Sequence, residues 1–261
     1  MNRKPVVESA IIIAVFFFAF YGRKWISSTI AAPDLTLFWK VAFFYAWWVI
    51  PTLITIGLLY GFKGILREIG IERGFLTGLI FSAFVTLPMF VSSALIGQID
   101  DSLSLASLFH ETLLAGFMEE YFFRGFLFGL LFRKAGWGFI PAGVSGAFLF
   151  GLGHIYQGST FAETLGVFIV TAMGALWFAW LYIEWNENLW IPIFLHGFMN
   201  LSWGLFEVSQ NALGGWYTNF FRMITIAVSI VVTIRYHRKC GLRIRRRTLF
   251  YGFQSMAAER K

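Results

Sequence analysis

Residues 41–62 read VAFFYAWWVIPTLITIGLLYGF, a run without a charged side chain. A helix needs about 20 consecutive apolar residues to cross the ~30 Å hydrocarbon core of a bilayer. This run is therefore predicted to span a membrane. The whole chain shares its character, with 58% hydrophobic and only 13% charged residues, whereas an average soluble domain is about 25% charged. Such a composition excludes a soluble globular domain, a disordered chain and a collagen-like chain.

Seven further apolar runs of similar length flank this one. The predicted spans are 6–22, 40–62, 74–97, 104–132, 138–155, 163–183, 189–207 and 219–236. The first span is predicted to be a retained helix and not a signal peptide, because Arg23 and Lys24 follow it directly and no A-x-A cleavage site appears. The expected fold class is all-α: a polytopic membrane helix bundle of about eight transmembrane helices, with any active site inside the bundle.

The expected organisation is one transmembrane domain, residues 1–237, followed by a basic cytoplasmic tail, residues 238–261. The lone cysteine, Cys240, excludes an internal disulfide and a cysteine-based metal cluster. Seven basic residues lie between Arg235 and Arg247. A basic run beside a long apolar segment is typical of a flank that touches anionic lipid. We therefore expect the lipid bilayer, and no nucleic acid, as its partner.

The distribution of basic residues predicts the orientation of the bundle. With the N-terminus in the cytoplasm, sixteen of the 21 basic residues lie on the inside and three on the outside. The inside residues are Arg3, Lys4, Lys63, Arg67, Arg73, Arg133, Lys134, the seven of the basic run, Arg260 and Lys261; the outside ones are Arg23, Lys24 and Lys40. The positive-inside rule then places both termini in the cytoplasm.

Ionisable and amide side chains gather in motifs in three of the apolar runs; outside these motifs the spans hold Glu8, Arg222 and, near an end, Glu207. An ionisable group in hydrocarbon costs at least ~2.5–3.5 kcal/mol, so it usually faces the bundle interior and serves a function. The fourth span carries Glu119, Glu120 and Arg124, the fifth ends at His154, and the seventh carries His196 and Asn200. These six residues are the candidate site. The core that bears them covers residues 104–207.

Helical spacing suggests a role for each residue. Glu120 and Arg124 are one turn apart with the acid first, the favourable order for an ion pair, so they are expected to neutralise each other. Glu119 lies about 100° further round the helix, which leaves its carboxylate available as a general base. His154 could pair with Glu119 around one water molecule, and together they would make a hydrolytic site.

His196 and Asn200 are also one turn apart and point to one side of their helix. An imidazole and an amide can both donate hydrogen bonds to one oxygen atom, which is the chemistry of an oxyanion hole. Each motif alone is more often structural, since packing pairs also place charges inside helices. Their conjunction in one chain favours a functional site.

Other catalytic motifs are missing. His110-Glu111 begins like the zinc-protease motif H-E-x-x-H, but position 114 is leucine. The chain has neither a G-x-S-x-G nucleophile motif nor a glycine-rich P-loop with lysine.

The ordered set Glu119-Glu120-x-x-x-Arg124, Phe150-x-x-x-His154 and His196-x-x-x-Asn200 resembles the motifs of the CAAX protease and bacteriocin-processing (Abi) family, which includes the type II CAAX prenyl endopeptidases. The resemblance implies an intramembrane glutamate protease. In it Glu119 and His154 would activate water, His196 and Asn200 would stabilise the oxyanion, and Glu120 and Arg124 would support the site. No motif residue departs from the family pattern.

The resemblance also bears on cofactor and substrate. Two histidines and a glutamate could hold zinc, but Asn200 is a poor zinc ligand, so no metal or other cofactor is expected. The substrate would be a membrane-embedded or lipid-anchored polypeptide. Whether prenylated substrates are used stays open, because members of the family differ in this.

Two other functions remain open at this stage. In a proton-coupled transporter, Glu119, His154 and Arg124 would form a proton relay. In a non-catalytic membrane scaffold or immunity protein, the same motifs would serve packing alone. The small size and the absence of a cleavable signal favour a multi-pass protein of a prokaryotic cell membrane.

Overall fold

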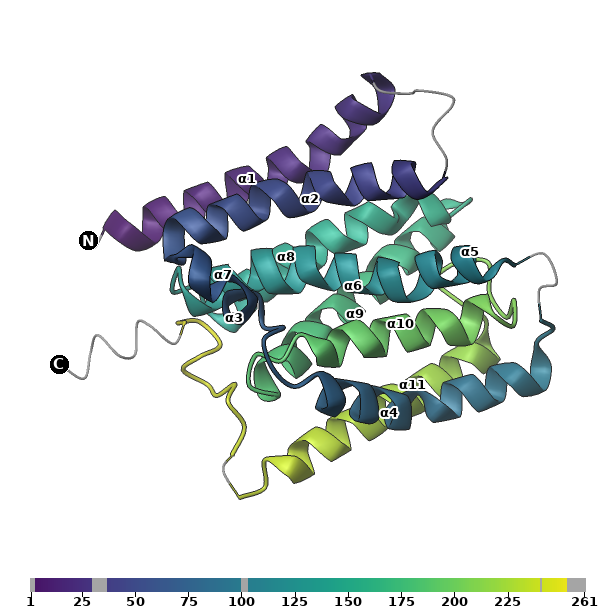
Figure 1. The fold of residues 1–261 in the computed structure, drawn as a ribbon. Coiled ribbons are helices and arrows are strands. Elements are labelled where there is room, and N and C mark those ends of the chain that lie inside the picture. The colour runs from purple at the N-terminus through teal and green to yellow at the C-terminus, as the bar shows by residue number, and fades with distance from the viewer. Residues whose placement is uncertain (1–2, 30–36, 100–102, 240, 253–261) are drawn as a thin grey trace.

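The computed structural model describes residues 3–29, 37–99, 103–239 and 241–252, and these ranges are largely helical (Figure 1). The helices are α1 (Arg3–Thr29), α2 (Leu37–Tyr60), α3 (Ile65–Ile69), α4 (Phe75–Ile96), α5 (Leu105–Phe109), α6 (Ala115–Glu120), α7 (Gly129–Arg133), α8 (Phe139–His154), α9 (Phe161–Glu184), α10 (Trp190–Gly204) and α11 (Trp216–Tyr236). The described residues form no strand; one isolated bridge pairs Trp137 with Tyr251. The predicted all-α bundle is confirmed.

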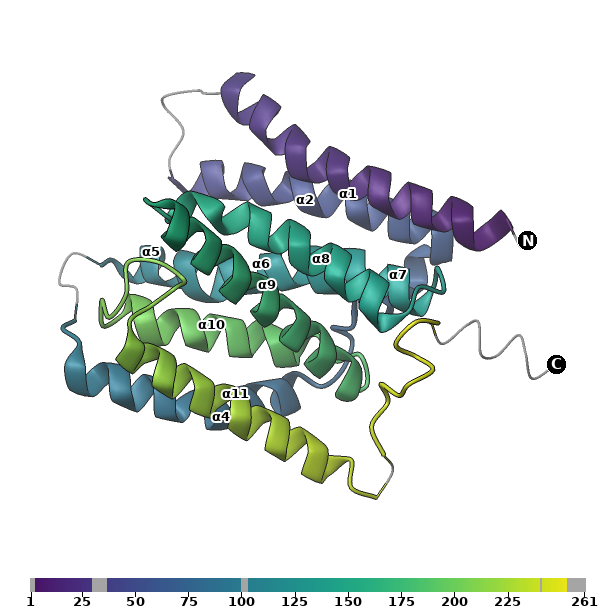
Figure 2. The same ribbon diagram turned by 180° about the vertical axis from the view of Figure 1, so that it is seen from behind.

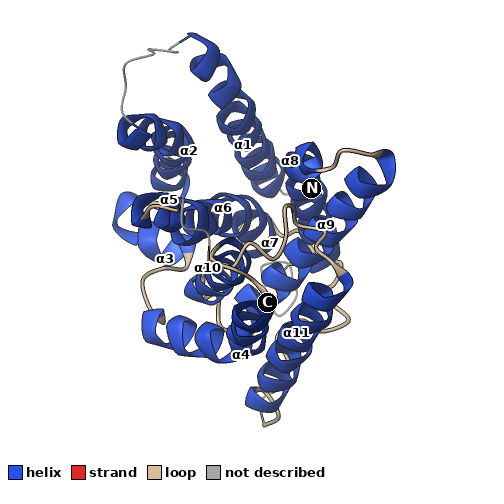
Figure 3. Ribbon diagram, turned by 90° about the vertical axis from the view of Figure 1, so that its right-hand side faces the viewer, coloured by secondary structure: helices blue, strands red, loops and turns tan. Residues whose placement is uncertain are grey.

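The helices run roughly parallel or antiparallel to one axis (Figure 1). Helices α1 and α2 pack together along one side, and α4 and α11 pack together on the other. Helices α6, α8, α9 and α10 lie between these two layers, and α8 packs on α9 (Figure 2). Viewed nearly end-on, α1 and α2 diverge from each other toward their connection (Figure 3).

The segment from Leu105 to Arg133 is one continuous helical stretch at the centre of the bundle. Two π-helical parts, His110–Leu114 and Tyr121–Phe128, alternate with α5, α6 and α7. Every residue from 121 to 133 is buried. Apart from Arg124, the sequence YFFRGFLF carries apolar and aromatic side chains and one glycine, and the burial of all eight residues shows that other parts of the protein surround this segment.

The membrane-spanning character follows from length and composition. Among the described residues, six helices are long and apolar enough to cross a membrane: Lys4–Gly22, Trp39–Tyr60, Phe75–Ile96, Phe139–Gln157, Phe161–Glu184 and Trp216–Tyr236. The other two predicted spans fall on the α/π segment of residues 105–133 and on α10, which has 15 residues. The chain is a multi-pass integral membrane protein, and the count of eight spans stays a prediction.

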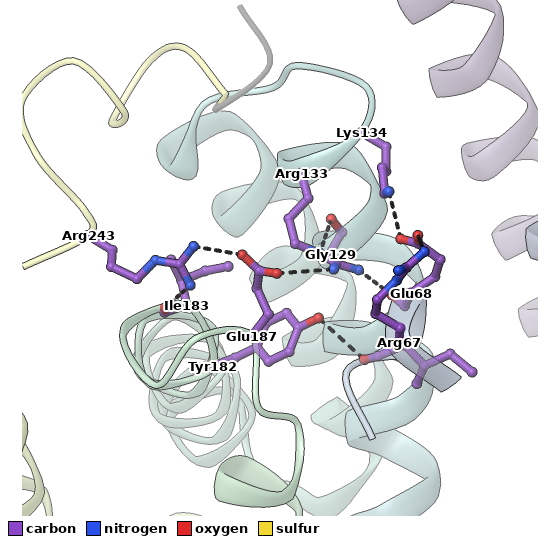
Figure 4. A network of polar contacts seen from close by, with 10 residues as sticks. Arg67, Glu68, Gly129, Arg133, Lys134, Tyr182, Ile183, Glu187 and Arg243 are labelled. Atoms are coloured by element: carbon purple, nitrogen blue, oxygen red, sulfur yellow. Dashed lines mark hydrogen bonds and ion pairs between the residues drawn. The ribbon is translucent and has the colours of Figure 1, made fainter. Parts of the chain in front are cut away.

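A network of charged residues closes one end of the bundle (Figure 4). Lys134 Nζ lies 2.8 Å from Glu68 Oε2, joining α3 to the end of α7. Glu187 Oε2 lies 3.5 Å from Arg133 Nη1, and Glu187 Oε1 accepts a 2.8 Å hydrogen bond from Arg243 Nη2.

This network gathers several of the cations predicted to lie on the inside. Both the start of α1 and the described end of the tail lie at the same end of the bundle (Figure 1). Which side of the membrane this end faces stays a prediction. Arg260 and Lys261 lie outside the described residues, and the side chains of Arg3, Arg23 and Lys24 are likewise outside the description.

Part of the predicted tail folds back onto the bundle. The buried carboxylate of Glu184 accepts hydrogen bonds from the backbone N–H groups of Arg243 and Ile244, at 2.8 and 2.9 Å. Phe139 and Ile140, the first residues of α8, donate backbone hydrogen bonds to the carbonyls of residues 248 and 249. Residues 241–252 therefore cap two helix ends, and residues 253–261 lie outside the described part.

The turn between α9 and α10 is strained and held from two sides. Asn186 and Glu187 both have a φ of 58°, a left-handed conformation that costs on the order of 1–3 kcal/mol per residue away from glycine. Asn188 donates from its side chain to the carbonyl of Gly74, and Leu189 donates its backbone N–H to the carbonyl of Gly70. These bonds anchor the start of α10 to the loop that precedes α4.

The close approach of α4 to α10 gives a stability prediction. A Cβ atom on Gly78 would lie 2.6 Å from the backbone carbon of Trp190, which cannot move aside as a flexible side chain could. We expect Gly78→Ala to lower the free energy of unfolding by ~1–3 kcal/mol, the usual cost of overpacking. Denaturant-induced unfolding in detergent micelles measures it.

Gly174→Ala in α9 is the matched control. A Cβ atom there meets nothing within 4 Å, so alanine is expected to leave stability unchanged or raise it slightly. Equal stability of the two variants would contradict the tight α4–α10 contact.

Candidate active site

Three of the predicted residues meet at one carboxylate oxygen. Glu119, on α6, places Oε2 3.8 Å from Nε2 of His154, at the end of α8, and 3.9 Å from Nε2 of His196, on α10. The three side chains remain partly exposed, by 26%, 18% and 13%. Both separations exceed a direct hydrogen bond, so the two imidazoles lie around this oxygen without bonding to it directly.

A second, more deeply buried arrangement adjoins the first. Glu120 Oε1 is 3.0 Å from Arg124 Nη1 and 2.8 Å from His196 Nδ1, and the Glu120 side chain is 0% exposed. The predicted Glu120–Arg124 ion pair is therefore present. The hydrogen bond between Glu120 and His196 was not predicted from the sequence, where His196 was linked only to Asn200.

Hydrogen bonding fixes which nitrogen of each imidazole faces Glu119. His154 Nδ1 lies 2.8 Å from the carbonyl oxygen of Phe150, so this nitrogen is the donor. His196 Nδ1 lies 2.8 Å from a carboxylate oxygen of Glu120 and is likewise assigned as a donor. When neutral, each ring therefore directs the lone pair of Nε2 toward Glu119.

A glycine pair brings the helices close enough for these contacts. A Cβ atom on Gly116, in α6, would lie 3.0 Å from the backbone nitrogen of Gly197, in α10. Gly116 comes one turn before Glu120, and Gly197 follows His196 directly. A side chain at Gly116 would press on the backbone of Gly197, next to the level where Glu120 meets His196.

Aromatic rings surround the buried guanidinium. The guanidinium carbon of Arg124 lies 4.3 Å from the ring centroid of Phe150 and 5.5 Å from that of Phe178. Cation–π contacts of this kind stabilise a desolvated cation by about 2 kcal/mol. Phe178 could not be singled out from the sequence, because it is one of 32 phenylalanines and lies outside every motif.

Asn200 is placed differently from the other candidates. Its Nδ2 donates a long hydrogen bond of 3.4 Å to the carbonyl of Glu111, in the π-helical turn that precedes α6. It lies one turn beyond His196 on α10. The structure therefore brings Glu119, Glu120, Arg124, His154 and His196 into one cluster and leaves Asn200 at its edge.

Among the described residues, no group of three His, Cys, Asp or Glu side chains is arranged to hold a metal ion. Glu119 Oε2 lies 3.8 Å from His154 Nε2 and 3.9 Å from His196 Nε2, while zinc makes bonds of ~2.0–2.2 Å to nitrogen and oxygen. One nitrogen of each imidazole is already engaged with Phe150 or Glu120.

The comparisons with known proteins agree with this geometry. Residues 101–202 match the family model described as type II CAAX prenyl endopeptidase Rce1-like. That range contains all three motifs and every residue of the cluster. The resemblance predicted from the motifs is confirmed over this part of the chain.

A relative supports the same class. The chain is 36% identical over 83 residues to the Bacillus subtilis (strain 168) protein named "Putative membrane peptidase YdiL". That match covers 32% of this chain and 30% of the relative. No solved structure matches the chain. Together the two matches support a membrane protease.

The buried charge cluster gives a second prediction. Removing one partner of a buried ion pair leaves the other charge uncompensated, which typically costs ~3–5 kcal/mol. Arg124→Met should therefore lower the free energy of unfolding by an amount in that range, measured by denaturation in micelles. Arg73→Met is the control, because Arg73 is 91% exposed and pairs with exposed Glu72; it should have little effect. Similar losses in both variants would contradict the proposed importance of burial.

Proposed function

We propose that this protein is an intramembrane endopeptidase that hydrolyses a peptide bond in a membrane-embedded or lipid-anchored polypeptide, with Glu119 and His154 activating the attacking water. The observation that carries the proposal is the pairing of Glu119 Oε2 with the Nε2 of His154 across 3.8 Å. A water molecule there can donate one hydrogen bond to the carboxylate and one to the imidazole. Both acceptors raise its nucleophilicity, and either can take its proton during attack.

The second imidazole fits a different role. His196 donates from Nδ1 to Glu120, so its Nε2 can donate to an oxyanion only when the ring carries both protons. The carboxylate of Glu120 supplies the countercharge for that imidazolium through Oε1, which Arg124 Nη1 also meets at 3.0 Å. The negative charge of a tetrahedral intermediate would then meet an N–H donor already in place.

Asn200 would supply the second oxyanion donor. It lies one helical turn from His196, and its present hydrogen bond, 3.4 Å long, is weak. A bound substrate could therefore draw the amide away from Glu111 at small cost. Catalytic hydrogen bonds are often long before substrate binds.

The surroundings of the cluster favour a substrate that reaches it from the membrane. The cluster is built from α6, α8 and α10, and much of the bundle surface consists of exposed large apolar side chains, such as Leu58, Ile80 and Leu95. A polypeptide held in the bilayer has its scissile bond near these helices already. The mechanism needs no metal, because the carboxylate and the imidazole supply both proton transfer and water binding.

Replacement of Glu119 tests the proposal. We expect purified Glu119→Gln protein to lose cleavage of membrane-anchored and prenylated peptides, read by mass spectrometry, because glutamine cannot accept a proton. Wild-type activity should persist in a chelator. Cleavage that survives in the variant would refute the mechanism, and loss of wild-type activity in the chelator would restore a metal to it.

Glu111→Gln is the matched control. It makes the same change on the same helical segment, at an exposed residue whose backbone carbonyl alone contacts Asn200, so cleavage should be close to wild type. Proton flux into liposomes, measured on the same samples, distinguishes a protease from a transporter. A transporter would be favoured if the wild type conducts protons, Glu119→Gln does not, and neither protein cleaves peptide.

The oxyanion role makes a quantitative prediction. Removal of one oxyanion donor typically lowers kcat by ~10²–10³, so Asn200→Ala should be slow but active, with KM little changed. A variant with wild-type kcat would remove Asn200 from the site.

A further inference from the structure

We propose that Phe150 is a positioning residue that holds the two halves of the catalytic cluster in register, His154 with Glu119 on one side and Arg124 with Glu120 and His196 on the other. This inference rests on the proposed function and adds to it a residue that does not touch the reacting atoms. The inference is based on the position of the Phe150 ring, which contacts residues of both halves.

The first half contacts Phe150 twice. The His154 ring lies over the Phe150 ring, with centroids 4.3 Å apart and planes tilted by 37°. His154 Nδ1 also donates to the Phe150 carbonyl at 2.8 Å. The hydrogen bond restricts where Nδ1 lies, and the aromatic contact restricts rotation of the ring about that bond. Both constraints are needed to aim Nε2 at Glu119.

The second half contacts the same aromatic ring. The Arg124 guanidinium lies 4.3 Å from the Phe150 centroid, and Arg124 pairs with Glu120, which in turn binds His196. The His196 ring itself lies 6.3 Å from Phe150, centroid to centroid, at an interplanar angle of 71°. A displacement of the Phe150 ring would therefore move groups on α6, α8 and α10 together.

Phe150 is held in turn by helices that lie outside the motifs. Phe123 meets it edge-on, with centroids 5.0 Å apart and planes at 90°. Next to Phe123, Phe122 stacks at 4.5 Å against both Phe16 of α1 and Trp48 of α2. The ring of Phe150 is only 5% exposed. Through these aromatic contacts, α1 and α2 support the position of the catalytic cluster.

The test is Phe150→Leu, which keeps the backbone carbonyl and an apolar side chain but removes the ring face. A misplacement of about 1 Å in a catalytic group can cost on the order of 10²-fold in rate. We expect kcat to fall ~10–10²-fold with KM within about twofold, and the pH–rate profile to change, because the orientation of His154 is altered. Phe150→Tyr keeps the ring and should retain most of the wild-type kcat.

Phe148→Leu is the matched control, because Phe148 lies on the same helix but is 52% exposed and packs on Phe168. It should leave kcat and the pH profile unchanged. Wild-type kinetics in Phe150→Leu would overturn the inference, and so would an equal loss in Phe148→Leu. If Phe150→Leu fails to fold, Phe150→Met carries the same test, since it fills the space without a ring face.

The variants distinguish failure of the positioning role from failure of the proposed function. If Glu119→Gln abolishes cleavage while Phe150→Leu matches the wild type, only the positioning role is wrong. If Glu119→Gln cleaves like the wild type, the proposed function fails, and the positioning role fails with it.

Discussion

The buried carboxylate of Glu120 is the interaction on which the arrangement of this protein depends. It is fully buried and meets a guanidinium at 3.0 Å and an imidazole at 2.8 Å. A charge in such surroundings is tolerable only with close charged or hydrogen-bonding partners. Because those partners come from its own helix and from α10, the requirement fixes how the two helices face each other. The close contact of Gly116 with Gly197 lets them come near enough.

The catalytic proposal follows from that constraint. Once Nδ1 of His196 is committed to Glu120, its Nε2 must point the other way, toward Glu119. His154 reaches the same oxygen from α8 through its own committed Nδ1. The buried Glu120 thus orients His196 toward the partly exposed Glu119. The rings of Phe150 and Phe178 replace the water that would otherwise solvate Arg124.

Much of this could be predicted from the sequence, for physical reasons. Long uncharged runs must cross a membrane, so the helices end within a few residues of the predicted spans, as α4 and α8 do. Polar residues inside such runs are few and costly, which singled out Glu119, His154 and His196. The i,i+4 spacing within one helix predicted the Glu120–Arg124 pair.

Contacts between helices could not be predicted in the same way. Nothing in the spacing of Glu120 and His196 shows that they bond, because that depends on how α6 and α10 cross. The π-helical stretch Tyr121–Phe128 has an ordinary apolar sequence. Phe178 and Phe123 cannot be told from the other phenylalanines by sequence alone. The position of Asn200 at the edge of the cluster depends on the turn at Glu111.

The docking of residues 241–252 also has a consequence for biogenesis. The first amides of α8 donate to the carbonyls of residues 248 and 249. The Glu184 carboxylate accepts hydrogen bonds from the amides of residues 243 and 244. Translation makes these partners after α8 and α9, because residues 241–252 follow both helices along the chain. The two helix ends can therefore gain these hydrogen bonds only once that segment has been synthesised. Closure of this end follows the synthesis of the helices that it closes.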